Sequence, residues 1–446
     1  MAKRKKAVLL SLFLWGGGQF FIGKQKLKGI LLFLIQVLFL GIELRTGYWI
    51  EYFFGLIPKL SLRLHGGFFS KGIWGFVTLG NKAGAKNGDH STMLLVGGII
   101  TILVLSLFIL IFVWNLRDAY MTGKVIDQGG NYISSKEYIK AAYKKFFPYI
   151  ILAPIMILVV FVIFMPIIFS ILTAFTNYNK NHLPPASLID WVGFKNFIKL
   201  VQVPIWSNTF LSVLLWTVVW AVCSTFSTYF IGMLQAVLLN SKYVKHKSLY
   251  RSILILPWAI PQMISLLVFK NLLNGQFGPL GQLFIDLGLT DQRIPFLTDP
   301  LLAKIMVILV NLWMGFPMFM IMIQGILSNI DKGLYEAAEI DGAGSYQTFR
   351  KITLPLVFKA TGPLLVMNFA GNFNGFGAIF FLTEGGPVNP KYQLAGDTDI
   401  LISWIYKLTL NHQIYDMAAV MCIILFLMIA VVSFWNFKRT NAFKEV

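Results

Sequence analysis

The stretch YEAAEIDGAG at residues 335–344, followed by ITLP at 352–355, lies between two long apolar segments. Glu336 opens its acidic and alanine-rich part, and Gly342 follows six residues later. Because glycine adopts backbone conformations that other residues resist, Gly342 predicts a sharp break between two short helices. The stretch therefore predicts a helix-break-helix loop that a membrane protein presents to a soluble partner.

The flanking residues support two helices around that break. Asp331 is placed to cap the first helix and Ser345 to cap the second, while Pro355 opens the next apolar segment. Small alanine side chains let a partner approach the backbone closely, and Glu336 adds a charge that can orient it. We therefore predict a coupling loop at 331–355 whose contact residues are Glu336, Ala337, Ala338, Asp341, Gly342 and Ala343.

Apolar windows recur along the whole chain. Hydrophobic residues make up 57% of its 446 residues and charged residues 13%, and the mean hydropathy is +0.71. A helix needs about 20 mostly apolar residues to cross the hydrocarbon core. We predict an all-α polytopic membrane protein with about eight spanning helices, at 29–42, 94–115, 149–174, 209–239, 249–269, 305–327, 356–382 and 414–437. A ninth span within 7–22 would place one of the two basic termini outside the cell. We therefore expect that segment to lie partly in the membrane–water interface.

The basic residues predict the orientation of these spans. With the N-terminus inside, 24 of the 38 Lys and Arg residues lie in segments placed inside and 13 in segments placed outside. Cytoplasmic loops carry an excess of Lys and Arg, so we expect both termini and the 331–355 loop in the cytoplasm. Interruption of the charge by apolar spans argues against a nucleic-acid surface, although the net charge is +19.

The chain divides near Phe147. We predict an N-terminal membrane region at 1–146, with one or two spans near 7–44, one at 94–115 and a basic cytoplasmic linker. A core with six spans would then occupy 147–446. The apolar start looks like a signal peptide, but it has no convincing cleavage site, and we expect it to be retained.

The sequence offers no catalytic or metal site. Residues 18–25, GQFFIGKQ, have the spacing of a phosphate-binding loop, but Gln replaces the Ser or Thr that holds magnesium and no strand precedes them. Five scattered histidines and two unpaired cysteines show no ligand spacing. We therefore expect no catalytic residues, metal or cofactor in this chain.

The centres of the six C-terminal spans lack ionisable residues and carry amides beside aromatic rings. Missing intramembrane charges argue against ion-coupled transport and against a charged cargo. Amides donate and accept hydrogen bonds, so with flat apolar faces they suit a neutral polyhydroxylated ligand. Interhelical hydrogen bonding is the competing interpretation for each amide, and the GxxxG spacing of Gly371 and Gly375 is also compatible with close helix packing.

Several motifs resemble one family. The coupling loop resembles that of ABC-importer permeases. The larger permease subunit of maltose and maltodextrin ABC importers is matched by LPWAIP at 256–261, NLWMGFP at 311–317, NFN at 372–374, LTEGGP at 382–387 and AGDTD at 395–399. The resemblance implies a second permease subunit, two ATPase subunits that dock at the coupling loops and themselves bind ATP and Mg, and an extracellular solute-binding protein. A short 177–207 loop resembles the compact Gram-positive kind, whose binding protein is expected to be a lipoprotein.

The resemblance also implies a sugar site in the middle of the membrane. The aligned positions are Trp258, Gln262, Asn311, Met314, Gly315, Met318, Gly371, Asn372 and Gly375. Asn311, Gly315 and Asn372 keep the family residue type, whereas Gln262, Met318, Gly371 and Gly375 depart from it.

The implied function is import of maltodextrin or maltose across the bacterial cell membrane. Another neutral sugar, such as a raffinose-type oligosaccharide, is the alternative within the class. A glycerol-phosphate cargo would need central cations, which the core spans lack. A membrane-embedded glycan-processing enzyme would need paired carboxylates at a cavity, for which only Asp397 and Asp399 offer a close outside pair. A proton-coupled symporter is disfavoured by the uncharged spans.

Overall fold

The computed structural model describes residues 2–130, 135–241 and 244–439, and within these ranges it is helical, without strands. Contacts divide the chain into two compact units, Met1–Gly193 and Phe194–Val446. The all-α prediction is confirmed. The predicted boundary at 146 would assign the span that follows it to the permease core, and it stays a prediction.

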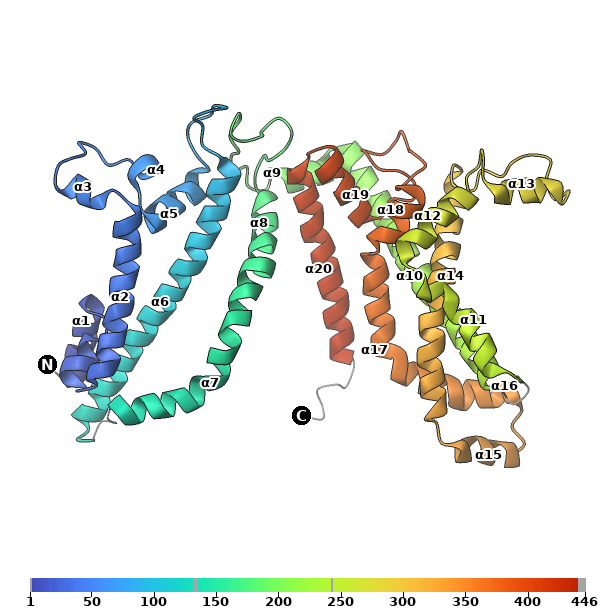
Figure 1. Cartoon of the computed structure of the whole chain (residues 1–446), viewed down its shortest axis with the longest axis horizontal. Coiled ribbons are helices and arrows are strands. Elements are labelled where there is room, and N and C mark those ends of the chain that lie inside the picture. Colours follow the sequence, from blue (N-terminus) through green and yellow to red (C-terminus); the bar gives the residue numbers. More distant parts are fainter. Residues whose placement is uncertain (1, 131–134, 242–243, 440–446) are drawn as a thin grey trace. The chain divides into compact units, whose positions relative to one another are not determined.

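The first unit contains three long apolar helical runs and several short helices (Figure 1). Its elements are α1 (Lys3–Phe13), η1 (Gly18–Ile22), α2 (Lys26–Thr46), α3 (Trp49–Phe53), α4 (Leu62–His65), α5 (Phe68–Thr78), α6 (Ser91–Asp127), α7 (Ser135–Val159), η2 (Val160–Phe164) and α8 (Met165–Thr173).

The second unit places a short helix, α15, at one end and a group of short helices at the other (Figure 1). Its elements are α9 (Lys195–Gln202), α10 (Pro204–Asn240), α11 (Lys247–Ala259), α12 (Gln262–Leu272), α13 (Pro279–Asp286), α14 (Pro300–Ser328), α15 (Lys332–Ile340), α16 (Ser345–Thr348), η3 (Phe349–Thr353), α17 (Leu354–Phe373), α18 (Phe376–Thr383), α19 (Leu401–Tyr406), η4 (Lys407–Asn411) and α20 (Tyr415–Arg439). We call the end that carries α15 the inner end of this unit and the opposite end the outer end.

The predicted spans fall on apolar helices. Among the described residues, six helical runs are long and apolar enough to cross a membrane: Lys26–Thr46, Ser91–Asp127, Phe146–Thr173, Pro204–Asn240, Pro300–Ser328 and Ser345–Phe373. The bent pair of α11 and α12 provides a seventh, and the shorter apolar stretch Tyr415–Val431 matches the eighth predicted span. Helix α1 has 11 residues and is too short to cross.

Two predicted spans differ from straight helices. The pair α11 and α12 bends by 87° where Ile260 adopts an extended conformation before Pro261, as expected for a residue that precedes proline. The predicted 356–382 span breaks after Phe373, and Gly375 becomes the N-cap residue of α18. Hydropathy alone missed both breaks because the residues on either side remain apolar.

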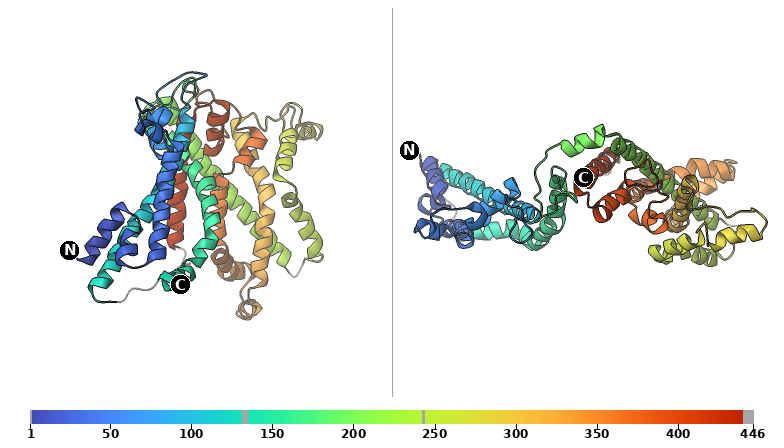
Figure 2. Two further views of the ribbon diagram at one scale, coloured as in Figure 1. Left: turned by 60° about the vertical axis from the view of Figure 1, so that its left-hand side comes forward. Right: turned by 90° about the horizontal axis from the view of Figure 1, so that it is seen from above.

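Close packing of α10 against α14 organises the second unit (Figure 2). A Cβ atom built on Gly232 of α10 would lie 2.7 Å from the carbonyl oxygen of Phe316. A Cβ atom built on Gly315 of α14 would lie 2.8 Å from Cγ2 of Thr228. At each glycine, atoms of the other helix occupy the space that a side chain would fill. Small residues allow membrane helices to gain van der Waals contact in this way, because no hydrophobic driving force brings them together in lipid.

A buried carboxylate fastens the outer loop between α18 and α19. The Asp399 side chain accepts hydrogen bonds from the Gly396 N–H at 2.7 Å and the Ser403 hydroxyl at 2.8 Å, and the Lys407 ammonium lies 2.5 Å away. Burial raises the pKa of the Asp399 carboxyl, and the positive charge of Lys407 opposes that rise. Gly385 has φ +77°, and a Cβ atom there would lie 1.9 Å from the carboxylate, so the site requires glycine.

In the first unit, the phosphate-loop-like segment instead makes a packed polar junction. A Cβ atom on Gly18 would lie 2.2 Å from the Ala7 carbonyl oxygen, and the Gly18 N–H donates to the Ser11 hydroxyl at 2.9 Å. The Gln19 side-chain amide donates to the Asn115 carbonyl at 3.0 Å and to Asp118 at 3.1 Å. The glycines of this segment serve close helix contact, and its polar atoms join α1, η1 and α6.

Gln19→Leu is expected to lower the stability of this junction. The substitution removes the Gln19 oxygen that accepts from the buried Ser11 hydroxyl and the Gln19 amide that donates to Asn115, and a buried polar group left without its partner costs about 1–3 kcal/mol. The midpoint of thermal unfolding in detergent should fall relative to the matched control Gln128→Leu, whose side chain is exposed. Equal midpoints for the two variants would contradict the structural role of Gln19.

Candidate functional site

The coupling helix α15 has defined caps at both ends. At its start, the Asp331 carboxylate accepts a hydrogen bond from the Gly333 N–H at 2.9 Å, which confirms the predicted cap. At its end, the Gly342 N–H donates to the Glu339 carbonyl at 3.1 Å and the Ala343 N–H donates to the Ala338 carbonyl at 2.9 Å. These paired bonds form a Schellman motif, and Gly342 supplies the left-handed residue with φ +74°.

The second helix of the loop starts differently from the prediction. Ser345 is the first helical residue and does not act as the cap. Gly344 occupies the cap position, and its N–H donates to the Gln347 side-chain oxygen at 3.3 Å. Gln347, three residues after Gly344, therefore accepts from the cap residue itself, whereas a serine cap would accept from an N–H of the first helical turn.

The coupling loop leaves apolar side chains exposed at the inner end of the unit. Ile340 is 87% exposed, Tyr346 71% and Leu334 47%. The predicted contact residues Glu336, Ala337, Asp341 and Gly342 are exposed, and Ala338 and Ala343 are half-buried. Exposed apolar side chains among polar ones are typical of a surface for protein binding.

One side-chain contact ties this loop to the following span. The Tyr335 hydroxyl lies 3.2 Å from the Thr353 hydroxyl of η3. Displacement of α15 is therefore resisted by the start of the next long helix as well as by the short connection from α14.

The candidate sugar residues, as we call the nine aligned positions, fall on α11, α12, α14, α17 and the start of α18. Trp258 is 57% exposed, and Gln262 is exposed on the other side of the α11–α12 bend. The Gln262 side-chain oxygen lies 4.0 Å from a Cβ atom built on Gly377, which brings α12 beside α18.

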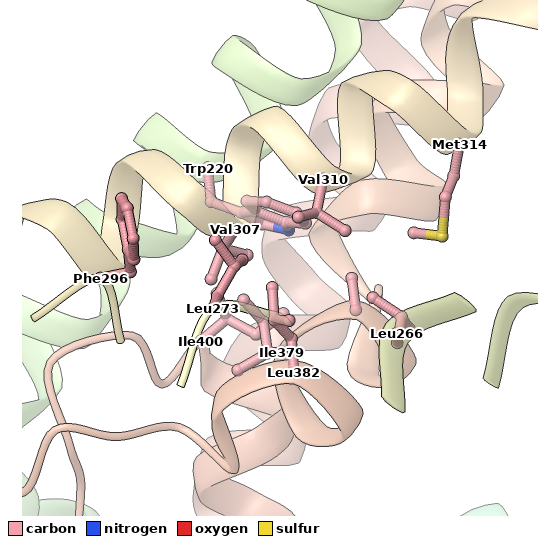
Figure 3. Close-up of a cluster of buried hydrophobic side chains, with 11 residues drawn as sticks. Trp220, Leu266, Leu273, Phe296, Val307, Val310, Met314, Ile379, Leu382 and Ile400 are labelled. Atoms are coloured by element: carbon pink, nitrogen blue, oxygen red, sulfur yellow. The ribbon is translucent and has the colours of Figure 1, made fainter. Parts of the chain in front are cut away.

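The four candidates on α14 divide into two roles. Asn311 is half-buried and Met318 is 46% exposed, so both are accessible in this chain. Met314 is buried in a hydrophobic cluster with Trp220 and Leu266 (Figure 3). Gly315 receives Thr228 of α10, as described above. Met314 and Gly315 thus form packing contacts within the unit.

The candidates near the end of α17 also differ from one another. Gly371 has open space around its Cα atom. The Asn372 side-chain amide donates to the Thr225 hydroxyl and the Asn368 side-chain oxygen at 3.0 Å each. The backbone carbonyl of Asn372 accepts the Trp220 indole N–H at 3.0 Å. Asn372 therefore holds α17 against α10, which is the interhelical role that competed with sugar binding in the sequence.

The face of α10 that receives these residues was not predicted from the sequence. Trp220 and Thr225 bond Asn372, and neither belongs to a quoted motif. A signal was nevertheless present, because Ser224, Thr228 and Gly232 recur every four residues, the small-residue spacing of membrane-helix contacts.

These features define a class of protein: a multi-pass helical membrane permease with a capped, apolar-surfaced loop for a soluble partner. The family model of the binding-protein-dependent transport system inner membrane component matches residues 228–440. The chain belongs to this family. It is a permease subunit of a sugar ABC importer, a transport component and not an enzyme, and its family is that of binding-protein-dependent transport systems.

Two relatives cover almost the whole chain. The galactooligosaccharides transport system permease protein of Bacillus subtilis is 38% identical over 445 residues, which is 100% of each protein. The maltodextrin transport system permease protein of Streptococcus pneumoniae is 35% identical over 447 residues, covering 98% of this chain and 96% of the relative. The suspected relationship to the maltodextrin permeases is confirmed.

A solved structure shares the fold. It is a bacterial ABC transporter involved in the import of the acidic polysaccharide alginate, with a TM-score of 0.55 and 25% identity. The match covers 68% of this chain and 99% of that chain.

Gly342→Trp is expected to abolish ATP-driven uptake without preventing membrane insertion. The position has a left-handed backbone that costs a non-glycine residue about 1–2 kcal/mol, and the indole would project from the exposed surface of the loop. Uptake of labelled oligosaccharide by the complete transporter is the measurement, with the amount of chain in the membrane determined in parallel.

Gly344→Ala is the matched control for this change. Its φ is −70° and a Cβ atom there meets nothing within 4 Å, so near-normal uptake is expected. Normal uptake by Gly342→Trp would argue against the docking role of the loop.

Proposed function

We propose that this chain forms half of a translocation pathway for a neutral oligosaccharide. The observation that carries the proposal is the set of uncharged groups that α12 and α14 leave accessible: the Gln262 and Asn311 amides and the Met318 side chain. Amides bind sugar hydroxyls as donors and acceptors, and an uncharged pathway disfavours phosphorylated cargo.

Maltodextrin is the cargo that we propose. The quoted motifs and the retained residue types of Asn311, Gly315 and Asn372 favour the maltose and maltodextrin branch. A galactooligosaccharide is the second candidate, because the Bacillus subtilis relative with that printed substrate is 38% identical over the whole chain. The test measures how strongly maltodextrins of increasing length and β-galactosides each inhibit uptake of a labelled oligosaccharide. The series that inhibits more strongly identifies the cargo.

The proposed assembly contains a second permease subunit and two ATPase subunits, with an extracellular binding protein that we expect to be a lipoprotein. ATP and Mg would be bound by the ATPase subunits, and no cofactor by this chain. Both termini and α15 would lie in the cytoplasm, as the distribution of Lys and Arg favours. Closure of the ATPase dimer would move α15 and switch the spans between inward-open and outward-open states.

Asn311→Leu is expected to raise the KM for oligosaccharide uptake. The loss of one or two hydrogen bonds to the sugar corresponds to a change on the order of tenfold. Asn208→Leu is the matched control, since Asn208 is an exposed asparagine on α10 outside the candidate sugar residues. Equal KM values for the two variants would count against Asn311 as a sugar contact.

An assembly with an inactive ATPase partner tests the transport class. We expect oligosaccharide uptake to disappear. Uptake that persists would favour a proton-coupled symporter, and cleavage of the sugar by the isolated chain would favour a glycan-processing enzyme.

A further inference from the structure

A polar cavity of about 400 Å³ lies where α12 and α18 end and α14 begins, at the outer end of the second unit. It belongs neither to the coupling loop nor to the candidate sugar residues. Its polar lining residues are Lys270, Asn274, Gln276, Thr298 and Thr383, with Leu297 and Leu382 among the apolar ones. The volume falls within the range of about 300–1,000 Å³ that small-molecule sites occupy.

The cavity offers uncommitted groups of the kind that bind hydroxyls. The Asn274 side-chain oxygen accepts the N–H groups of Gln276 and Phe277 at 2.9 Å each, which directs the loop and leaves the amide nitrogen free. Among the described residues, the Gln276 side-chain amide and the Thr298 hydroxyl also make no hydrogen bond. These three groups supply donors and acceptors without a net charge.

Among the lining residues Lys270 carries the charge, and it is paired, while Arg293 beside the cavity donates to the Gln276 backbone carbonyl and the Gln282 side-chain oxygen. The Lys270 ammonium lies 2.5 Å from the Glu384 carboxylate and joins the outer ends of α12 and α18. Phe277, next to Gln276 in the sequence, is 83% exposed and presents an apolar ring at the same loop. Amides, a hydroxyl and a nearby aromatic ring match a neutral carbohydrate better than an ion.

The cavity is also aligned with the candidate sugar residues. Gln262, Asn311 and Gly375 are carried by α12, α14 and the start of α18, the same helices whose outer ends bound the cavity. Asn311 lies about 16 Å along α14 from Pro300, at 1.5 Å per residue. A disaccharide held near Asn311 would be too short to occupy the cavity as well, whereas a longer oligosaccharide can extend to it.

We propose that this cavity is an outer subsite that binds a sugar unit of long oligosaccharides as they pass from the binding protein into the pathway. The inference rests on the proposed function, because it supposes an oligosaccharide cargo. It adds a site that favours long chains over the disaccharide. The hydrogen-bonding groups that it assigns are the amides of Asn274 and Gln276 and the hydroxyl of Thr298.

The test uses the double variant Gln276→Leu with Thr298→Val in the complete transporter. Both changes remove polar groups without disturbing a hydrogen bond within the chain. Uptake kinetics are measured with maltose and maltohexaose, or with the disaccharide and hexasaccharide of the β-galactoside series if only that series is imported. The matched control is Gln292→Leu, an exposed glutamine in the neighbouring loop outside the cavity lining.

The double variant should raise the KM for the hexasaccharide on the order of tenfold and leave the KM for the disaccharide and the expressed amount unchanged. An unchanged KM for the hexasaccharide, or an equal rise for both sugars, overturns the subsite, and the second result would identify a docking surface for the binding protein. Wild-type import of the disaccharide alone also overturns it. Failure of the wild type to import any neutral sugar in the presence of ATP would instead refute the proposed function.

Discussion

The close contact between α10 and α14 is the constraint on which the rest of the second unit depends. Gly232 and Gly315 each admit the opposite helix, and nothing larger fits without displacing backbone or a β-branched side chain. Lipid gives these helices no hydrophobic reason to associate, so the contact has to come from shape. The fixed pair then gives α17 a surface to bond, through Trp220 and Thr225.

This packing divides residues that a family alignment treats as one site. Met314, Gly315 and Asn372 face contacts within the chain, while Gln262, Met318 and Gly371 remain open. The two groups serve one purpose, because an amide or aromatic ring can select a sugar only if the helix that carries it is held in place. Gly315 and Asn372, which pack, keep the family residue type, and so does the accessible Asn311, whereas the open Gln262, Met318 and Gly371 depart from it.

The sequence predicted the helical class, the spans and the coupling loop because those features are local. Hydrophobic windows have the length of the bilayer, and Asp331 and Gly342 determine the two ends of α15 through bonds within a few residues of themselves. The hydropathy windows indicated neither the bend at Ile260 nor the break at Gly375, since hydropathy does not register backbone direction.

Which of the candidate sugar residues are packed and which are accessible could not be predicted from the sequence either. It depends on contacts such as Asn372 with Thr225, which are separated by well over a hundred residues. The outer cavity forms where residues from 270–276, 295–298 and 382–383 meet. The spacing of these residues in the sequence does not predict that contact. Only the recurrence of small residues on α10 carried a readable signal of its packing face.

The connections on either side of α15 are short, and each leads into a long helix that packs on α10. On one side, Asn311 lies about 25 Å along α14 from Ser328, where that helix ends. On the other, Asn372 lies about 27 Å along α17 from Leu354, where that helix begins. Glycine contact holds α14 against α10, and the hydrogen bonds of Asn372 hold α17 against it. A displacement of α15 would therefore carry these three helices together, so that one side of the pathway moves as a unit.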